Sequence, residues 1–222
     1  MISAGTIRRL THPFLSKFWF RRGTRRKSKY PVGWMEIDVL PTVFHPKYFG
    51  SSMIFARFIE ALGLSGRRFL DMGTGSGIIG LFAARAGAVV TSVDVNPEAV
   101  RCATENASRA GFKIRACESD LFGSLANERF DVIAWNPPFF PQPANNVAEA
   151  ALYAGEDHAT IRRFAGEARD HLSDGGAIYL IFSLDGGMDA IEGIFRDAGF
   201  SLRSVHSERW GLADTMTVLE MR

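Results

Sequence analysis

The 222-residue sequence has few cysteines and no long apolar run, the features that are typical of disulfide-bonded secreted proteins and of membrane proteins. It contains only two cysteines, Cys102 and Cys117, without metal-ligand spacing, so we expect a reduced, cytoplasmic protein with no metal site. No apolar run approaches the roughly 20 residues that a membrane helix needs, and we expect no membrane contact. The apolar run Phe18–Phe20 is also too short for the core of a secretory signal. These absences favour a globular protein inside the cell.

Acidic residues are missing from the first 35 positions, where nine basic side chains stand. The rest of the chain has 17 basic and 24 acidic residues, so a basic arm precedes an acidic body. The basic residues of the arm are Arg8, Arg9, Lys17, Arg21, Arg22, Arg25, Arg26, Lys27 and Lys29. We favour contact of segment 8–29 with RNA or the ribosome. A solvated extension and an organellar targeting peptide are the two alternatives.

Beyond the arm, apolar strand patterns alternate with helical ones. Such alternation predicts right-handed crossovers and an α/β fold, a doubly wound, Rossmann-like and mostly parallel seven-stranded sheet. Because the last two strands have no helix between them, we expect an antiparallel hairpin at one edge. The expected strands are 67–73, 89–95, 113–120, 130–136, 176–183, 200–209 and 214–222. The expected helices are 50–64, 76–87, 96–111, 157–172 and 187–199.

Domain and helix boundaries follow from the same patterns. Residues 1–43 are expected to form the basic arm and a cover segment, with a short hairpin or irregular structure over 33–46, and residues 44–222 the domain. Ser51 or Ser52 is expected to cap the helix over 50–64. Asn96 is expected to cap the helix over 96–111, with Pro97 in its first turn.

A glycine-rich turn joins the first strand of the sheet to the next helix. The stretch Asp71–Gly80 reads DMGTGSGIIG, and its glycines allow a tight turn and a close approach to a ligand. Gly75–Gly80 also satisfies the dinucleotide pattern G-x-G-x-x-G, with Asp94 close to the distance of about 20 residues expected for a ribose-binding acid. A nicotinamide-dependent oxidoreductase is therefore one alternative, and a plain structural turn is another.

The register of this turn, D-x-G-x-G-x-G, resembles motif I of the class I S-adenosylmethionine (SAM) methyltransferases. The resemblance implies that residues 44–222 form a SAM-dependent methyltransferase domain. It further implies that the loop wraps the methionine part of SAM, that Asp94 holds the ribose, and that the segment after the third strand borders the adenine. The implied cofactor-binding residues are Asp71, Gly73, Thr74, Gly75, Gly77, Asp94, Val95, Asp120, Leu121 and Asn136.

The fourth strand ends in Asn136-Pro137-Pro138-Phe139, which resembles the [D/N/S]-P-P-[Y/F/W] motif of methyltransferases that act on planar nitrogens. Transfer to such a nitrogen requires acceptors for its N–H groups, and the Asn136 side-chain oxygen and the Pro137 carbonyl can each accept one. Phe139 can stack on the flat substrate group. The resemblance thus implies that Asn136, Pro137 and Phe139 are catalytic residues, and the prolines keep the acceptors rigid.

Residues 44–222 as a whole resemble the small-domain, HemK-like group, which methylates glutamine in translation release factors and ribosomal proteins. The resemblance implies a glutamine of a translation-associated protein as the substrate. Adenine N6 or guanine N2 of RNA is the alternative, because Phe139 stands where the glutamine enzymes usually have tyrosine, and a small-molecule amine is third. The segment 149–180 resembles the same group, with His158 where a glycine is common. The sequence makes no prediction of oligomeric state.

Overall fold

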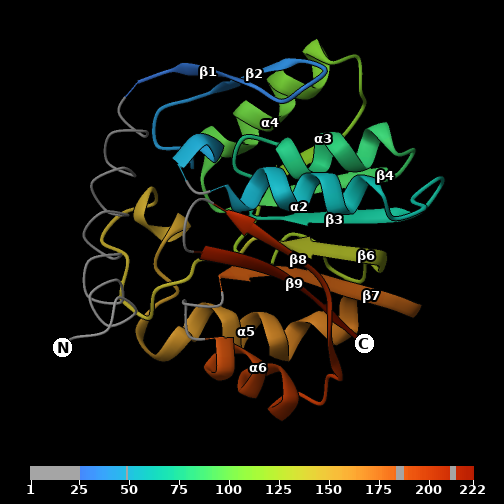
Figure 1. Cartoon of the computed structure of the whole chain (residues 1–222), viewed down its shortest axis with the longest axis vertical. Coiled ribbons are helices and arrows are strands. Elements are labelled where there is room, and N and C mark those ends of the chain that lie inside the picture. Colours follow the sequence, from blue (N-terminus) through green and yellow to red (C-terminus); the bar gives the residue numbers. More distant parts are fainter. Residues whose placement is uncertain (1–25, 49, 184–187, 211–213) are drawn as a thin grey trace.

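The computed structural model describes residues 26–48, 50–183, 188–210 and 214–222, which form a sheet with helices on both faces (Figure 1). The strands are β1 (Ser28–Pro31), β2 (Glu36–Val39), β3 (Arg68–Met72), β4 (Val89–Asp94), β5 (Arg115–Glu118), β6 (Phe130–Trp135), β7 (Leu172–Ser183), β8 (Leu202–Trp210) and β9 (Asp214–Met221). The α-helices are α2 (Ser51–Glu60), α3 (Ile78–Arg85), α4 (Pro97–Arg109), α5 (Ala159–Glu167) and α6 (Met188–Asp197). Short 3-10 helices cover Pro46–Tyr48, Glu149–Ala151, Glu156–His158 and Ala168–His171.

The main sheet has seven strands in the order β5-β4-β3-β6-β7-β9-β8. The pairs β3–β4, β3–β6, β4–β5 and β6–β7 are parallel, whereas β9 is antiparallel to both β7 and β8. The expected doubly wound α/β sheet and its hairpin edge are confirmed. The antiparallel strand β9 lies one position inside the edge, and β8 is outermost, so β8 runs in the same direction as β6.

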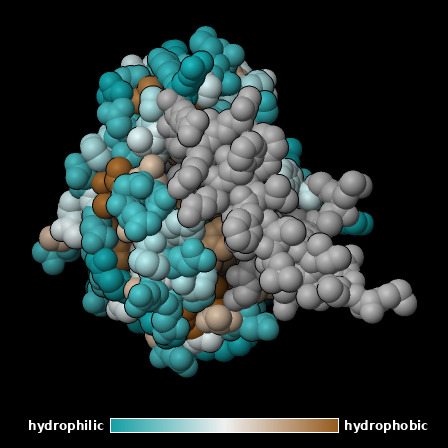
Figure 2. Space-filling model, turned by 90° about the vertical axis from the view of Figure 1, so that its left-hand side faces the viewer, coloured by the Kyte–Doolittle hydropathy of each residue, from teal (hydrophilic) through white to brown (hydrophobic). Residues whose placement is uncertain are grey.

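Apolar side chains fill the space on both faces of the sheet. Helices α2, α3 and α4 cover one face, and α5 and α6 cover the other (Figure 1). One core includes Phe55, Phe69 and Phe82, and the other includes Phe164 and Phe195. On the side of the molecule shown in Figure 2, apolar groups of the described residues reach the surface only in small areas between hydrophilic ones.

The β1–β2 hairpin packs on α4, and residues 28–46, which include it, form a cover over this part of the fold (Figure 1). Asp38 is buried, and its carboxylate pairs with Arg109 of α4 and with Lys27, each at 2.7 Å. The Asn106 side chain donates to the Asp38 carbonyl at 2.8 Å and to the Ser76 carbonyl at 2.9 Å. Asn106 therefore ties the hairpin to the glycine-rich turn.

Several element ends differ from the sequence prediction. The expected cap of α2 is wrong, because Gly50 is the N-cap and Ser51 and Ser52 lie inside the helix. The expected cap of α4 is confirmed, because the Asn96 side chain accepts from the Glu98 N–H at 3.0 Å and Pro97 opens the helix.

The predicted helix over 157–172 begins later and ends earlier than expected. Asp157 and His158 have φ of 50° and 56°, a left-handed conformation that an α-helix cannot continue through. Helix α5 therefore starts at Ala159. A 3-10 turn over Ala168–His171 follows α5, and β7 then begins at Leu172 instead of near residue 176.

Candidate active site

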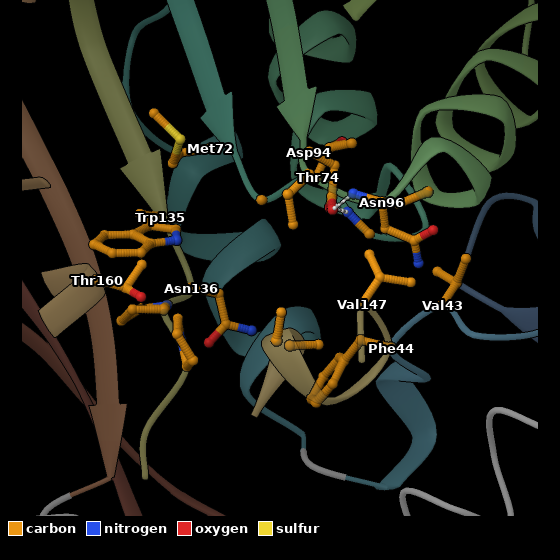
Figure 3. A pocket seen from close by; sticks show the side chains of 18 of the residues that line it. Val43, Phe44, Met72, Thr74, Asp94, Asn96, Trp135, Asn136, Val147 and Thr160 are labelled. Carbon is orange, nitrogen blue, oxygen red and sulfur yellow. Dashed lines mark hydrogen bonds between the residues drawn. The ribbon is translucent and has the colours of Figure 1, made fainter. Parts of the chain in front are cut away.

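A cavity of about 340 Å³ lies where β3, β4 and β6 end. The parallel register aligns Met72 with Val93 and with Trp135, so the segments that follow these three strands meet at one edge of the sheet. Asp94 and Asn136 project toward the same space from different sides (Figure 3). The structure thus brings the glycine-rich turn, the acid after β4 and the Asn-Pro-Pro-Phe corner together.

Asp71, the first residue of the glycine motif, does not line the cavity. Its side chain holds the glycine-rich turn in place through hydrogen bonds. Its carboxylate accepts from the Thr74 hydroxyl at 2.6 Å and from the Gly80 N–H at 3.0 Å. The side chain is completely buried, and this burial raises the pKa of Asp71 to about 7, although both hydrogen bonds lower the pKa. Asp71 therefore fixes the turn to the start of α3.

The glycines of the turn have two different tasks. Gly73, Thr74 and Gly75 line the cavity, and a Cβ placed on Gly75, at φ 53°, would meet open space. Gly77 does not line the cavity. At its φ of 84°, a Cβ would lie 2.9 Å from the Cα of Ala103 in α4, so Gly77 permits close helix packing.

Asp94 lies at the end of β4 and faces the cavity. Its two carboxylate oxygens accept from the Gly75 N–H and the Asn96 N–H, both at 2.9 Å. Burial raises the pKa of Asp94, and the backbone N–H groups around it oppose that rise. Val95, the next residue, also lines the cavity. The arrangement presents a carboxylate to a ligand with hydroxyl donors.

Asp120 and Leu121, which the resemblance implies as cofactor-binding residues, line the cavity after β5. The Asp120 carboxylate is mostly exposed and pairs with Arg163 of α5 at 3.0 Å. Leu121 has a φ of 50°, which is unfavourable for a bulky side chain. The buried Ser119 hydroxyl donates to the Leu121 carbonyl at 2.7 Å and accepts from the Ser124 N–H, which holds this turn in place.

Asn136 follows β6, and the two ends of its side-chain amide have different surroundings. The nitrogen Nδ2 donates to the hydroxyls of Ser51 at 3.2 Å and Ser52 at 3.3 Å. The oxygen Oδ1 is buried and has no hydrogen-bond partner within the part of the chain that the structure describes. Pro137 and Phe139 also line the cavity, and the Phe139 ring packs edge-on against Phe182, with centroids 5.8 Å apart.

Three residues of the cover, Thr42, Val43 and Phe44, line the cavity and were not predicted as site residues. The Asn96 side chain donates to the Thr42 carbonyl at 3.2 Å, so the cap of α4 also holds the cover. Phe44 packs against Leu152 and Tyr153, and Tyr153 also lines the cavity. Asn96 was predicted only as a cap, and no sequence pattern indicated these contacts.

The lining fits SAM. The turn over Gly73–Gly75 offers backbone space that a side chain on Gly75 would occupy, and Asp94 offers acceptors for ribose hydroxyls. The buried Asn136 Oδ1 offers an acceptor for the N–H of a substrate beside it. Within the described ranges, no group of three or more His, Cys, Asp or Glu residues could hold a metal ion, and no helix is long and apolar enough to cross a membrane.

Comparisons with known proteins agree with this geometry. A family model described as methyltransferase small domain matches residues 35–200. A release factor glutamine methyltransferase from Bordetella pertussis is 34% identical over 159 residues, which cover 66% of this chain and 58% of the relative. A Methanocaldococcus jannaschii protein, whose name places it provisionally among the protein N5-glutamine methyltransferases, is 30% identical, covering 67% of this chain and 79% of that protein.

Among solved structures, a 16S rRNA N2 methyltransferase from T. thermophilus, in complex with AdoMet and guanosine, is similar with a TM-score of 0.65. It is 25% identical, and the match covers 87% of this chain and 49% of that one. The chain spans about half the length of several release factor methyltransferases that it matches, with 58% and 44% covered for two of them.

Proposed function

Because the chain belongs to the methyltransferase small domain family, we propose that it transfers a methyl group from SAM to the side-chain amide nitrogen of a glutamine in a translation-associated protein. Membership of this family argues against the alternative of a nicotinamide-dependent oxidoreductase, in which the Asn-Pro-Pro-Phe corner has no role. The seven-stranded sheet with its antiparallel β9 is the class I methyltransferase fold. SAM is accordingly the cofactor.

The observation that carries the proposal is the buried Oδ1 of Asn136 without a hydrogen-bond partner in the described part of the chain. A buried acceptor left unpaired costs about 1–3 kcal/mol, so its retention in a cavity indicates a donor that arrives with the substrate. A primary amide supplies such an N–H donor, and so does an aromatic amine.

When bound, SAM supplies an electrophilic methyl group. The residues of the chain prepare the nitrogen that receives it. Asn136 Oδ1 and the Pro137 carbonyl each accept one N–H, which concentrates the lone pair on the nitrogen and stabilises its developing positive charge. Phe139 packs against the flat amide and sets its angle. The extra proton leaves to water after transfer, so the reaction needs no strong base.

Glutamine is favoured over RNA by the named relatives, two of which act on or are assigned to glutamine. Guanine N2 of RNA is the second candidate. It is supported by the similarity to the T. thermophilus rRNA enzyme over 87% of this chain, and by Phe139 in place of tyrosine. Both candidates present a planar NH₂ group to the same acceptors.

The basic arm is the proposed contact with the ribosome or RNA, through segment 8–29. Residues 8–25 lie outside the described residues. In the part of this segment that the structure describes, Lys27 pairs with Asp38, and Lys29 pairs with Glu36 at 2.8 Å. Both lysines therefore neutralise acidic residues of the cover. The proposal therefore rests on the arginines and lysine before residue 27.

The decisive experiment labels a cell lysate, depleted of small molecules, with tritiated SAM and the purified chain. Asn136→Ala is the control, and the labelled material is divided between nuclease and protease treatments. Label that is released by protease and absent with Asn136→Ala supports the glutamine proposal. Label that is released by nuclease supports guanine or adenine of RNA instead, and an absence of SAM binding rejects the proposed function.

A further inference from the structure

We propose that the indole N–H of Trp135 donates a hydrogen bond to the carboxylate of SAM. The inference rests on the proposed function, because it assigns a cofactor contact to the last residue of β6, directly before Asn136. Trp135 was not among the predicted site residues, although it lines the cavity. The carboxylate belongs to the methionine part of SAM, which the glycine-rich turn is implied to wrap, and Trp135 lies beside that turn.

Packing holds the Trp135 ring in place beside the cavity. The ring lies against Phe164 of α5, with centroids 4.3 Å apart, and the residue is only 3% exposed. Its nitrogen Nε1 points toward the cavity (Figure 3). A Cβ placed on Gly73, at φ 63°, would lie 3.4 Å from Nε1. The absence of a side chain at Gly73 therefore leaves room for a ligand atom beside the indole N–H.

The side-chain N–H donors of the cavity differ in whether they are already engaged. Among the described residues that line the cavity, only Asn96, Trp135 and Asn136 carry such donors. The Asn96 amide donates to Thr42, and the Asn136 amide contacts two serine hydroxyls of α2. The Trp135 N–H has no hydrogen bond within the described part of the chain. Because an indole N–H can only donate, it requires an acceptor from outside this part of the chain.

The charges around the cavity favour an anion as that acceptor. No Lys, Arg or His is among the described lining residues, whereas Asp94 and Asp120 are. The carboxylate of SAM must therefore be held by neutral N–H or O–H donors. Two N–H groups of the turn are already used, that of Thr74 by the Val93 carbonyl and that of Gly75 by Asp94, both at 2.9 Å. The Trp135 N–H supplies a donor at this place.

The C=O of the substrate amide is another acceptor, but it lies on the wrong side of Trp135. Successive side chains of a strand point to opposite faces, and Trp135 packs on α5 whereas Asn136 contacts α2. The substrate nitrogen is proposed to bind at Asn136, while Nε1 of Trp135 lies beside Gly73. The position of the indole nitrogen therefore favours the cofactor.

The test compares SAM with decarboxylated SAM, which lacks only the carboxylate, on the native chain and on Trp135→Phe. Calorimetric titration measures both affinities. We expect Trp135→Phe to weaken SAM binding at least about tenfold, the change that follows the loss of a hydrogen bond to a charged group. Decarboxylated SAM should bind the variant within about threefold of its native affinity, because Phe keeps a ring against Phe164. Trp210→Phe is the matched control and should change neither affinity, because Trp210 does not line the cavity.

A second readout follows the N–H group itself in the native chain. The chain has four tryptophans, and each indole N–H gives one ¹H–¹⁵N signal. The Trp135 signal is assigned through its own side-chain and backbone correlations, so this measurement does not depend on the folding of a variant. We expect SAM to move the signal downfield, as a hydrogen bond to a carboxylate does, and decarboxylated SAM to move it less.

The outcomes separate this inference from the proposed function. Equal losses of affinity for the two cofactors in Trp135→Phe, or a Trp135 signal that both cofactors move alike, would overturn the inference and leave the proposed function in place. A loss confined to the KM of the substrate would also overturn it and would assign the N–H to the substrate amide. A native chain that does not bind SAM would reject the proposed function, and the inference with it.

Discussion

At the scale of residues, two aspartates in the same region, Asp71 and Asp94, have different tasks. Asp71 accepts hydrogen bonds from Thr74 of the turn and from Gly80 of α3, whereas Asp94 presents its oxygens to the cavity. Both pKa values are raised by burial, but only Asp94 is placed to contact a ligand. The motif D-x-G-x-G-x-G therefore combines one structural acid with two glycines that line the cavity, Gly73 and Gly75, and a third, Gly77, that packs against α4.

The raised pKa of Asp71 predicts a pH-dependent stability. Its pKa is about 7 in the folded chain and about 3.9 when unfolded, so the stability gained from the protonated acid is complete below pH ~4 and is lost as pH rises through ~7. We compare the free energy of unfolding of the native chain with that of Asp71→Asn. Between pH 5 and 7, the native chain should lose up to about 1.4 kcal/mol per pH unit relative to the variant. A constant difference across this range would contradict the assignment.

Asp94 is predicted to control cofactor affinity. Asp94→Asn should weaken SAM binding at least about tenfold, because hydrogen bonds to a charged acceptor contribute roughly 1.5–3 kcal/mol. Calorimetric titration with SAM measures the change. Asp120→Asn is the matched control. Its carboxylate is mostly exposed and pairs with Arg163, so we expect a smaller change. Equal losses in the two variants would argue against a special role for Asp94.

At the scale of elements, the register of three parallel strands builds the site. Met72, Val93 and Trp135 lie level with one another in β3, β4 and β6. The glycine-rich turn, Asp94 and Asn136 follow these residues and therefore lie side by side. The position of each of these residues at a strand end could be predicted from the sequence, because buried strands and their carboxyl ends leave a clear apolar pattern.

Gly77 is predicted to set the distance between the turn and α4. Gly77→Ala should destabilise the chain by roughly 1–3 kcal/mol more than Gly111→Ala does. Both glycines have left-handed φ, of 84° and 77°, but only at Gly77 would the new Cβ meet Ala103. Chemical denaturation measures both. A similar loss for the two variants would show that strain alone, and not packing, requires glycine here.

What the sequence did not reveal is long-range in origin. Serine is a residue type that often caps helices, but the hydroxyls of Ser51 and Ser52 contact the side-chain nitrogen of Asn136. Only the folded sheet creates this contact. The cover residues Thr42–Phe44 reach the cavity because Asp38, Asn96 and Asn106 fasten the cover to α4. Such contacts between distant segments have no local pattern, so tertiary structure decides them.

At the scale of the whole molecule, the dense run of basic residues and the proposed catalytic residues lie in different parts of the sequence. The nine basic residues of the first 35 precede a body with an excess of acid, and the described Lys27 and Lys29 already pair with acids of the cover. The division into an arm and cover over 1–43 and a domain over 44–222 stays a prediction. The cytoplasmic location of the chain also stays a prediction.

Removal of residues 1–25 is predicted to separate substrate delivery from chemistry. The shortened chain should methylate a glutamine-containing peptide at the native rate, but should label ribosomes or large RNA–protein particles less, most clearly at low salt, where phosphate contacts are strongest. Filter-binding counts of tritiated methyl groups measure both substrates. An undiminished label on the particles would remove the arm from the proposal.

The most direct test of the central claim is single-turnover methyl transfer by the native chain and by Asn136→Ala, with SAM affinity measured on both. The claim is that the cavity holds SAM and that Asn136 Oδ1 accepts an N–H of the substrate amide. We predict that Asn136→Ala binds SAM within about threefold of the native affinity but transfers the methyl group about 100-fold more slowly, as expected when one preorganised hydrogen-bonding group of a catalytic site is lost. Transfer at the native rate by Asn136→Ala, or a native chain that does not bind SAM, would contradict the account.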